Sequence, residues 1–432
     1  MLGFRALILT EGETGESSQL LVPAMSQGFA PAVVLTTPRP VPLEVSALSQ
    51  GLVDCFKSVE DPRVERGKWH LLSDILIIAI LSTLAGGKGW EAMELYGSSK
   101  EGWLSTFLAL PNGIPSPDTF RRVIERLHPK QMEAAFENWV RTLVTDIGVQ
   151  VIAIDGKKLR GSYDRNNETP CLYLVSAWAA DHRLVLGQTK VRDKSNEITA
   201  VPALLELLDI SGCIVTLDAM GTQTEIAAQI RGANADYILC LKRNHPTLFN
   251  QVETWFETAR SEHRLPKSAE HTVECGHQRI EKRQVWTIPL SALPALYKAG
   301  DWAGLQTIVI VERTRQLWNK TTHEIQFYLT SLDAENPRVG SAIRQHWSIE
   351  NSQHWVLDVT FGEDACRVRS MHGPQNLAVL RRFALNALNR ESSGKKRSLV
   401  QKTRLAAMSD DYMVKVLVAA LPELSQSSSP AT

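Results

Sequence analysis

The chain has 432 residues, of which 44% are hydrophobic and 22% charged, a composition typical of a soluble globular protein with two or three domains. Basic and acidic residues number 47 each, so the overall charge neither indicates nor excludes a polyanionic partner such as a nucleic acid. The six cysteines form no CxxC pair and no zinc-binding spacing with histidine, so we expect reduced thiols in a cytoplasmic protein.

Helices are expected along the N-terminal part of the chain. Residues 1–45 mix Gly, Ser, Thr and Pro without sustained periodicity, and we interpret them as a flexible leader. From 46 to 148 apolar residues recur at helical spacing, which predicts an all-helical N-terminal domain. Its most apolar stretch has 11 residues between Asp74 and Gly86, too short to cross a bilayer, so we expect a buried helix and no membrane association. The segment "IPSPDTFRRVIERL" fits a DNA-recognition helix and an ordinary capped helix about equally.

The pattern changes to alternating strands and helices at residue 149. Strands are expected at "VQVIAIDG", on both sides of the turn in "CLYLVSAWAADHRLVLGQTKV", at "CIVTLDAM" and at "DYILCLK". Helices are expected between the last three strands, at "NEITAVPALLELLDISG" and "TQTEIAAQIRGANA". Three strands before the first helical crossover indicate an α/β ribonuclease-H-like core with a mixed five-stranded sheet, of which residues 149–244 form the first part.

A β-rich insertion is expected to split this core. Residues 245–335 contain one helical segment followed by strand-like segments. Helices resume afterwards, so 336–392 is interpreted as the helical end of the core. We interpret 393–432 as a basic linker and C-terminal tail.

Two aspartates follow predicted strands that lie side by side in this fold. Asp155 follows "VIAI" and precedes what we interpret as a basic loop, and Asp218 follows "IVTL". Two carboxylates brought close together are unstable unless a cation joins them. Hard oxygen ligands suit Mg²⁺ or Mn²⁺, and two such ions about 3.5 to 4 Å apart support phosphoryl transfer.

A third carboxylate is expected from Glu350, in a segment interpreted as one continuous helix. At helical spacing His354 and Asp358 lie near the Glu350 face, so we regard them as candidate supporting residues. Each acid also has a structural explanation, because Asp at a strand end is often a turn former and a helix can carry acids on a solvated face. The coincidence of two strand-end aspartates and a later helical glutamate favours metal-dependent phosphoryl transfer on nucleic acid.

DNA binding must come from local basic surfaces because the whole chain is neutral. Basic residues follow Asp155 directly, and residues 367–404 contain ten basic residues against one acid. Such a segment could neutralise several phosphates, and a solvated helix with a disordered linker is the alternative. We predict DNA contact by seven of these side chains: Lys157, Lys158, Arg160, Arg367, Arg369, Arg381 and Arg382.

Six segments resemble, in the same order along the chain, the DDE transposases of bacterial insertion sequences. The segments are "AIDGKKLRGS", "KSNEITAVPALL", "LDAMGTQTEIAAQI", "ADYILCLKRNHPTL", "GHQRIEKRQVW" and "HWSIENSQHWVLDVTFGEDACRVR". The resemblance is to the ISAs-one branch of the IS-four-like group, which includes the H-repeat-associated proteins. Several separated motifs in one order are far more specific than any one of them.

The resemblance implies a catalytic and metal-binding triad of Asp155, Asp218 and Glu350, which would hold Mg²⁺ or Mn²⁺, as two ions. It also implies cleavage of the transposon ends to leave a 3′-hydroxyl that attacks target DNA, without a covalent protein intermediate. Double-stranded DNA is then the partner, and the joining of two ends favours a homodimer assembled on DNA.

Two alternatives stay open, and one feature departs from the wider group. The alternatives are a transposase-derived DNA-binding protein that no longer cuts, and a ribonuclease-H-like nuclease with another nucleic-acid substrate. In the IS-four-like group Tyr, Arg and Lys flank the glutamate, whereas here Ile343, His346 and Leu357 occupy those offsets. The DNA contacts of that group therefore do not transfer to these three side chains.

Overall fold

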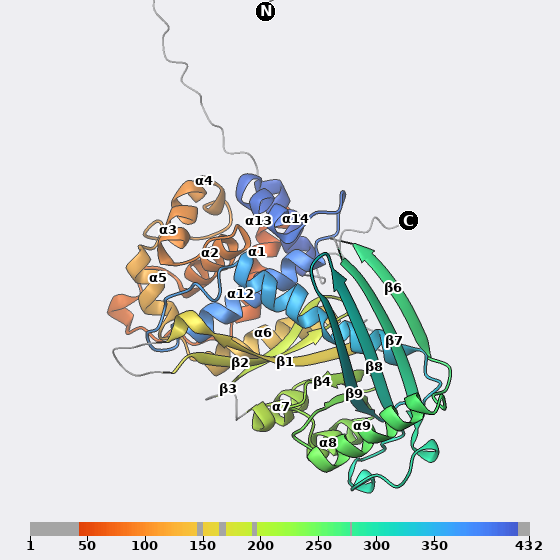
Figure 1. The fold of residues 1–432 in the computed structure, drawn as a ribbon. Coiled ribbons are helices and arrows are strands. Elements are labelled where there is room, and N and C mark those ends of the chain that lie inside the picture. Colours follow the sequence, from red (N-terminus) through yellow and green to blue (C-terminus); the bar gives the residue numbers. More distant parts are fainter. Residues whose placement is uncertain (1–42, 145–149, 164–169, 192–196, 277–278, 422–432) are drawn as a thin grey trace, which may run out of the picture. The chain divides into compact units, whose positions relative to one another are not determined.

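The computed structural model describes residues 43–144, 150–163, 170–191, 197–276 and 279–421 (Figure 1). Most of the leader predicted over 1–45 therefore lies outside the described residues, and the first helix begins at Leu43. None of the described helices is long and apolar enough to span a membrane.

The described chain before the sheet is helical, as predicted. The second of its helices, α2, lies at the centre: every residue from Asp74 to Leu84 is buried. A helix that is apolar on all sides must be surrounded by other elements, which is why this stretch is a core helix. The elements of this region are α1 (Leu43–Phe56), η1 (Glu65–Gly67), α2 (Leu72–Leu84), α3 (Trp90–Ser99), α4 (Glu101–Leu104), α5 (Pro117–Ile124) and α6 (Pro129–Val144).

A mixed sheet of nine strands follows, in the order β3-β2-β1-β4-β5-β9-β8-β7-β6 (Figure 1). The first strand pairs antiparallel with β2 and parallel with β4, and β4 pairs parallel with β5. The strands are β1 (Val151–Leu159), β2 (Leu172–Ala179), β3 (Leu184–Val191), β4 (Ile214–Leu217), β5 (Asp236–Leu241), β6 (Glu270–Gly276), β7 (Arg279–Pro289), β8 (Thr307–Leu317) and β9 (Thr321–Thr330).

The expectation of a five-stranded sheet is wrong, because the strands of 245–335 extend the same sheet. The last of them, β9, pairs antiparallel with β5 from Ile238↔Thr330 to Leu241↔Phe327. Without β9, this side of β5 would be an edge with unpaired backbone groups, and pairing removes that liability. Strand periodicity identifies strands but not their partners, so the sequence pattern could not show this continuity.

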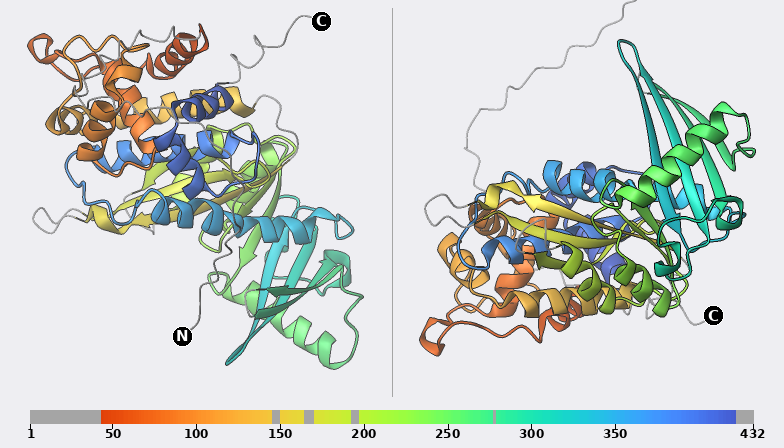
Figure 2. Two further views of the ribbon diagram at one scale, coloured as in Figure 1. Left: turned by 90° about the horizontal axis from the view of Figure 1, so that it is seen from above. Right: turned by 60° about the horizontal axis from the view of Figure 1, so that its bottom comes forward.

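Helices lie on both faces of the sheet around β1 and β4 (Figure 2). Alternate residues of β1 and β4 point to opposite faces: Val151 and Ile214 pack with α10, whereas Ile152 and Val215 join the larger core that includes the N-terminal helices. The remaining helices of the sheet region are α7 (Glu197–Glu206), α8 (Thr224–Gly232), α9 (Pro246–Ser261) and α10 (Arg338–His346).

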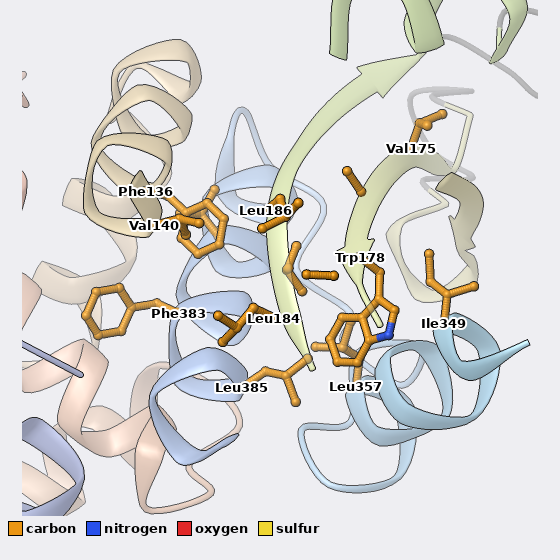
Figure 3. Close-up of a cluster of buried hydrophobic side chains, with 14 of the residues drawn as sticks. Phe136, Val140, Val175, Trp178, Leu184, Leu186, Ile349, Leu357, Phe383 and Leu385 are labelled. Carbon is orange, nitrogen blue, oxygen red and sulfur yellow. The ribbon is translucent and has the colours of Figure 1, made fainter. Parts of the chain in front are cut away.

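The long helix α12 (Gly373–Arg390) joins the sheet to the N-terminal helices and is buried along almost its whole length. Its Phe383 and Leu385 side chains lie in one buried cluster with Leu184 of β3 (Figure 3). It contacts α2, α5, α6 and β3. Its Phe383 ring stacks on Trp139 of α6 with a centroid distance of 3.9 Å. Within the segment that was interpreted as a basic linker and C-terminal tail, α13 (Leu399–Met408) and α14 (Asp410–Ala420) pack against α12.

Candidate active site

The register of β1 and β4 places Asp155 and Asp218 at neighbouring positions. The last pair of this parallel ladder is Ile154↔Leu217, and each aspartate is the next residue in its chain. The Asp218 Oδ1 atom accepts hydrogen bonds from the backbone N–H groups of Met220 (2.9 Å) and Gly221 (3.3 Å). Asp218 therefore also acts as a turn former, the structural role considered above for an aspartate at a strand end. The two hydrogen bonds orient its carboxylate.

The strand that carries Asp155 does not end there, and this corrects the expected basic loop. It continues to Leu159 because Gly156 to Leu159 keep pairing with β2. Side chains alternate along a strand, so Lys157 lies on the same face as Asp155 and Lys158 on the opposite face. The structure buries Lys157 and exposes Lys158.

Glu350 lies on a segment that is not one continuous helix. Between α10 and α11 (Trp355–Val359) the chain forms a π-helical turn, η6 (Ile349–His354), which packs against β1. Such turns insert an extra residue per helical turn and are frequent at functional sites. The Glu350 side chain is exposed, and the described residues contain no group of three His, Cys, Asp or Glu side chains close enough to hold a metal ion.

His354 is the supporting residue nearest to Asp155, with 3.6 Å between its Nδ1 atom and Asp155 Oδ2. The pKa of His354 is lowered to about 3, mainly by burial and also by the charges of Lys157 and Arg382. The imidazole is therefore neutral near pH 7 in this arrangement. The structure thus brings His354 to the first aspartate of the candidate site.

A buried ion-pair network connects β1 to the segment that follows Glu350. The Lys157 ammonium lies 2.5 Å from Asp358 Oδ1 and 3.1 Å from Glu363 Oε2, and it donates a hydrogen bond to the His354 carbonyl oxygen at 3.3 Å. Arg382 of α12 pairs with the other Glu363 oxygen at 2.6 Å, and both of these side chains are fully buried. We call Lys157, Asp358, Glu363 and Arg382 the Lys157 network.

The cations of the Lys157 network keep the buried Glu363 carboxyl ionised. Burial raises the pKa of Glu363, but the charges of Arg382 and Lys157 outweigh that effect and lower it to about 2. Two cations and two carboxylates therefore balance around the fully buried Glu363 and Arg382 side chains. Sequence reasoning missed Glu363, although strand alternation from Asp155 could have indicated that Lys157 points inward.

Two further contacts hold α10 and η6 against the sheet. His346 Nδ1 lies 2.9 Å from the Thr216 hydroxyl of β4, and Trp178 of β2 donates its indole N–H to the Ser348 hydroxyl at 3.0 Å. Ile343 and Leu357, which occupy two of the offsets that depart from the wider group, are buried in the core. These positions therefore support the segment rather than face solvent.

Three of the seven predicted DNA contacts are buried, and their assignment was wrong. Lys157 and Arg382 belong to the Lys157 network, and Arg381 is 5% exposed. The density of basic residues does not reveal which side of a helix is covered, and α12 is covered on nearly all sides. The four that are exposed are Lys158, Arg160, Arg367 and Arg369.

Three of the four exposed cations, Arg160, Arg367 and Arg369, belong to neighbouring segments. Arg369 donates a hydrogen bond from Nε to the Gly161 carbonyl oxygen at 3.2 Å, beside Arg160. Arg367 and Arg369 also line a hollow of about 630 Å³ together with Lys88 and Arg121 from the N-terminal helices. A polyanion placed here would contact both the sheet region and the helical region.

Comparison with known proteins identifies the family of the chain. Residues 148–387 match the family described as "Transposase DDE domain", and residues 53–140 match the family described as "DDE_Tnp_1-associated". The H repeat-associated putative transposase YhhI of Escherichia coli K12 is 35% identical over 81% of this chain and 92% of its own length. The putative transposase YncI of Escherichia coli O157:H7 is 34% identical over 85% of this chain and 94% of its own length.

A solved structure also aligns with much of the chain. It is a cryo-EM structure of the piggyBac transposase synaptic complex with hairpin DNA. The alignment covers 90% of this chain and 80% of the chain in that structure, with a TM-score of 0.38 and 12% sequence identity. At that score the likeness carries no argument about the site. The family matches carry the conclusion: this chain belongs to the DDE transposases of bacterial insertion sequences.

Proposed function

We propose that this transposase cuts phosphodiester bonds at the ends of its own insertion sequence and joins the released 3′-hydroxyl to target DNA. Asp155, Asp218 and Glu350 are the proposed catalytic residues. The observation that carries the proposal is the register of β1 and β4, which makes Asp155 and Asp218 neighbours. DDE transposases use divalent metal ions in general, and two adjacent carboxylates are the donors that such ions require.

The proposed fold of the catalytic core is ribonuclease-H-like. Strands β1 to β3 are consecutive and antiparallel, and β4 and β5 are parallel to β1 on its other side. This is the order that the sequence pattern led us to expect for that fold. The segment from α9 to β9 is then an insertion that extends the core sheet.

The chemical type of the proposed donors, carboxylate oxygen, suits a hard divalent cation. Asp155 and Asp218 supply adjacent carboxylates, and Glu350, on the turn that packs against β1, is the proposed third ligand. When bound, Mg²⁺ or Mn²⁺, as two ions, would supply the Lewis acid that activates the attacking oxygen and stabilises the leaving oxygen.

The chain's own groups then position the site. Backbone N–H groups hold one Asp218 oxygen, and the neutral His354 imidazole lies beside Asp155. The Lys157 network ties the Glu350 segment to the Asp155 strand. Such fixed support keeps catalytic groups in register with one another.

DNA is the proposed partner, as transposon ends and as target. Lys158, Arg160, Arg367 and Arg369 are the proposed phosphate contacts because they are the exposed members of the predicted set of seven cations. The helical region of 46–148 is proposed to contribute to end binding through the hollow that it shares with Arg367 and Arg369. Joining two ends requires two active sites, so we propose a homodimer on DNA in the bacterial cytoplasm.

The test is strand cleavage of DNA that carries the element's own ends, with Mg²⁺ or Mn²⁺. Wild type is compared with Asp155→Ala and Glu350→Ala, and Glu335→Ala serves as a matched control because Glu335 is an exposed acid outside the site. Metal-dependent nicking that is lost in the two site variants and kept in the control supports the proposal.

Two other results would contradict the proposal. Equal cleavage by wild type and both site variants means that the site is assigned to the wrong residues. Binding of the ends without cleavage by the wild type favours the DNA-binding protein that no longer cuts.

A further inference from the structure

A groove of about 580 Å³ lies beside the segment that carries Glu350. Asn351 and Ser352, the two residues after Glu350, line it. Its other walls come from the turn between β2 and β3 at Arg183, from α11 at Trp355, and from residues 391–400. We call it the Trp355 groove.

An exposed aromatic ring forms one wall of the Trp355 groove. Trp355 is 57% exposed, although the next two residues of α11 are buried. A single exposed apolar side chain is common on proteins and would carry no inference by itself. The inference depends on the combination of this indole with the charged side chains that line the same groove.

Among the charged residues of the lining, cations outnumber acids. Arg183, Lys395 and Lys396 have no ion-pair partner among the residues that the structure describes. The acid of the lining, Glu391, is 2% exposed, because its carboxylate is taken up by the Tyr412 hydroxyl (2.6 Å) and other groups. The groove therefore presents positive charge to solvent.

The walls of the groove are held in place by hydrogen bonds. Asn389 of α12 donates to the Arg183 carbonyl oxygen at 2.8 Å, which fixes the turn that carries this cation. At the other side Ser398 and Gln401 form a reciprocal capping box that starts α13 directly after the lysines. A site whose walls are fixed before binding loses less entropy when a ligand enters.

We propose that the Trp355 groove binds an unpaired stretch of DNA strand beside the cleavage site. A base stacks on the Trp355 indole, and the flanking phosphates lie against Arg183, Lys395 and Lys396. An aromatic platform within a cationic groove is the combination that binds single strands with little sequence preference. The face of a base is available for stacking only where the strand is unpaired, and the volume is that of a small-ligand site. The proposed function supplies the reason for an unpaired strand at this place.

The test measures binding separately from cleavage. The full chain carrying Asp155→Ala is titrated without metal ion against fluorescein-labelled oligothymidylate of about 12 nucleotides, within the range of single-strand sites. Fluorescence anisotropy reports the binding, and a duplex of the same length is the comparison. Trp355→Ala, Trp355→Phe and the double variant Lys395→Gln/Lys396→Gln are introduced into this background.

The expected results differ among the variants. Trp355→Ala should weaken single-strand binding about 5- to 100-fold, while Trp355→Phe keeps most of the affinity and duplex binding changes little. The double lysine variant should reduce the slope of log affinity against log salt by about 1.4, from roughly 0.7 for each phosphate contact. Trp318→Ala, which removes a tryptophan 85% exposed on the turn between β8 and β9, is the matched control and should change nothing.

A second measurement does not depend on the variants. Oligonucleotide containing 5-bromodeoxyuridine is photocrosslinked to the otherwise unaltered chain, and the crosslinked peptide is mapped; we expect the peptide that contains Trp355. Crosslinks elsewhere, or equal single-strand affinity of Trp355→Ala and Trp318→Ala, would overturn the proposal. Because no cleavage is measured, loss of the groove leaves the proposed function intact, and failure of the end-cleavage assay leaves the groove intact.

Discussion

Replacing Lys157 with methionine should destabilise the protein far more than the same change at Lys158. The two residues are adjacent on β1, but the Lys157 side chain is 7% exposed and pairs with Asp358 and the fully buried Glu363. Methionine keeps most of the volume and removes the charge. The change therefore leaves a buried carboxylate with Arg382 as its remaining cation.

The size of the effect follows from the Glu363 carboxyl. Its pKa falls from 4.5 to about 2 on folding, in spite of burial, because of Arg382 first and Lys157 second. A shift of that size corresponds to about 3 kcal/mol of stability at neutral pH. Since Arg382 stays in place, we expect Lys157→Met to cost about 2 kcal/mol, below the ~3–5 kcal/mol typical when a buried pair is fully broken.

The pH dependence has a definite sign. A depressed carboxyl pKa stabilises the folded state above pH 4.5, and that stability is lost as the pH falls from 4.5 towards 2. The difference between wild type and Lys157→Met should therefore be full at neutral pH and shrink in acid. Urea unfolding at several pH values measures it, with Lys158→Met as the control. A Lys157→Met variant within about 0.5 kcal/mol of Lys158→Met at neutral pH would refute the reasoning.

Three further changes test other parts of the fold. Burial and a neighbouring glutamate raise the pKa of Glu137 to about 7, so ionisation of Glu137 destabilises the folded state as the pH rises from 4.5 to 7. Glu137→Gln should therefore raise the free energy of unfolding, measured with urea, by about 1–2 kcal/mol near pH 8 and leave it unchanged near pH 4. Trp139→Ala should lose about 3–5 kcal/mol because it removes the ring that stacks on Phe383, and an unchanged melting temperature would count against this packing. Gly161→Ala should lose about 1–3 kcal/mol because its Cβ would collide with backbone carbonyl oxygens of residues 364 and 366, whereas Gly102→Ala, with open space, should lose nothing.

Neighbouring strand ends could be predicted from the sequence because they depend on local pattern and topology. The β-branched run before Asp155 and the short run before Asp218 identify two strands, and the order of elements makes them neighbours, as the register shows. The buried helix at 75–84 was equally predictable, because no polar face interrupts its apolar residues. These features require no knowledge of distant partners.

The errors arise where distant partners decide the outcome. Lys157, Arg381 and Arg382 were assigned to DNA because charge normally stays in solvent. All three are buried instead: Lys157 and Arg382 pair with Glu363, and the elements packed around α12 cover Arg381. The π-helical turn η6 depends on one extra residue per turn, which leaves no periodic signal in a segment of six residues. The roles of Asp155, Asp218 and Glu350 in catalysis stay a prediction.

The position of α12 has a consequence for synthesis of the chain. Helices α2 and α6 and strand β3 are complete by residue 191, yet the helix that covers them begins only at Gly373. During translation their apolar faces stay open until most of the protein has been made, which exposes the nascent chain to aggregation. A copy of the element with a stop codon before residue 373 should therefore yield material for proteolysis rather than a folded fragment that competes for DNA.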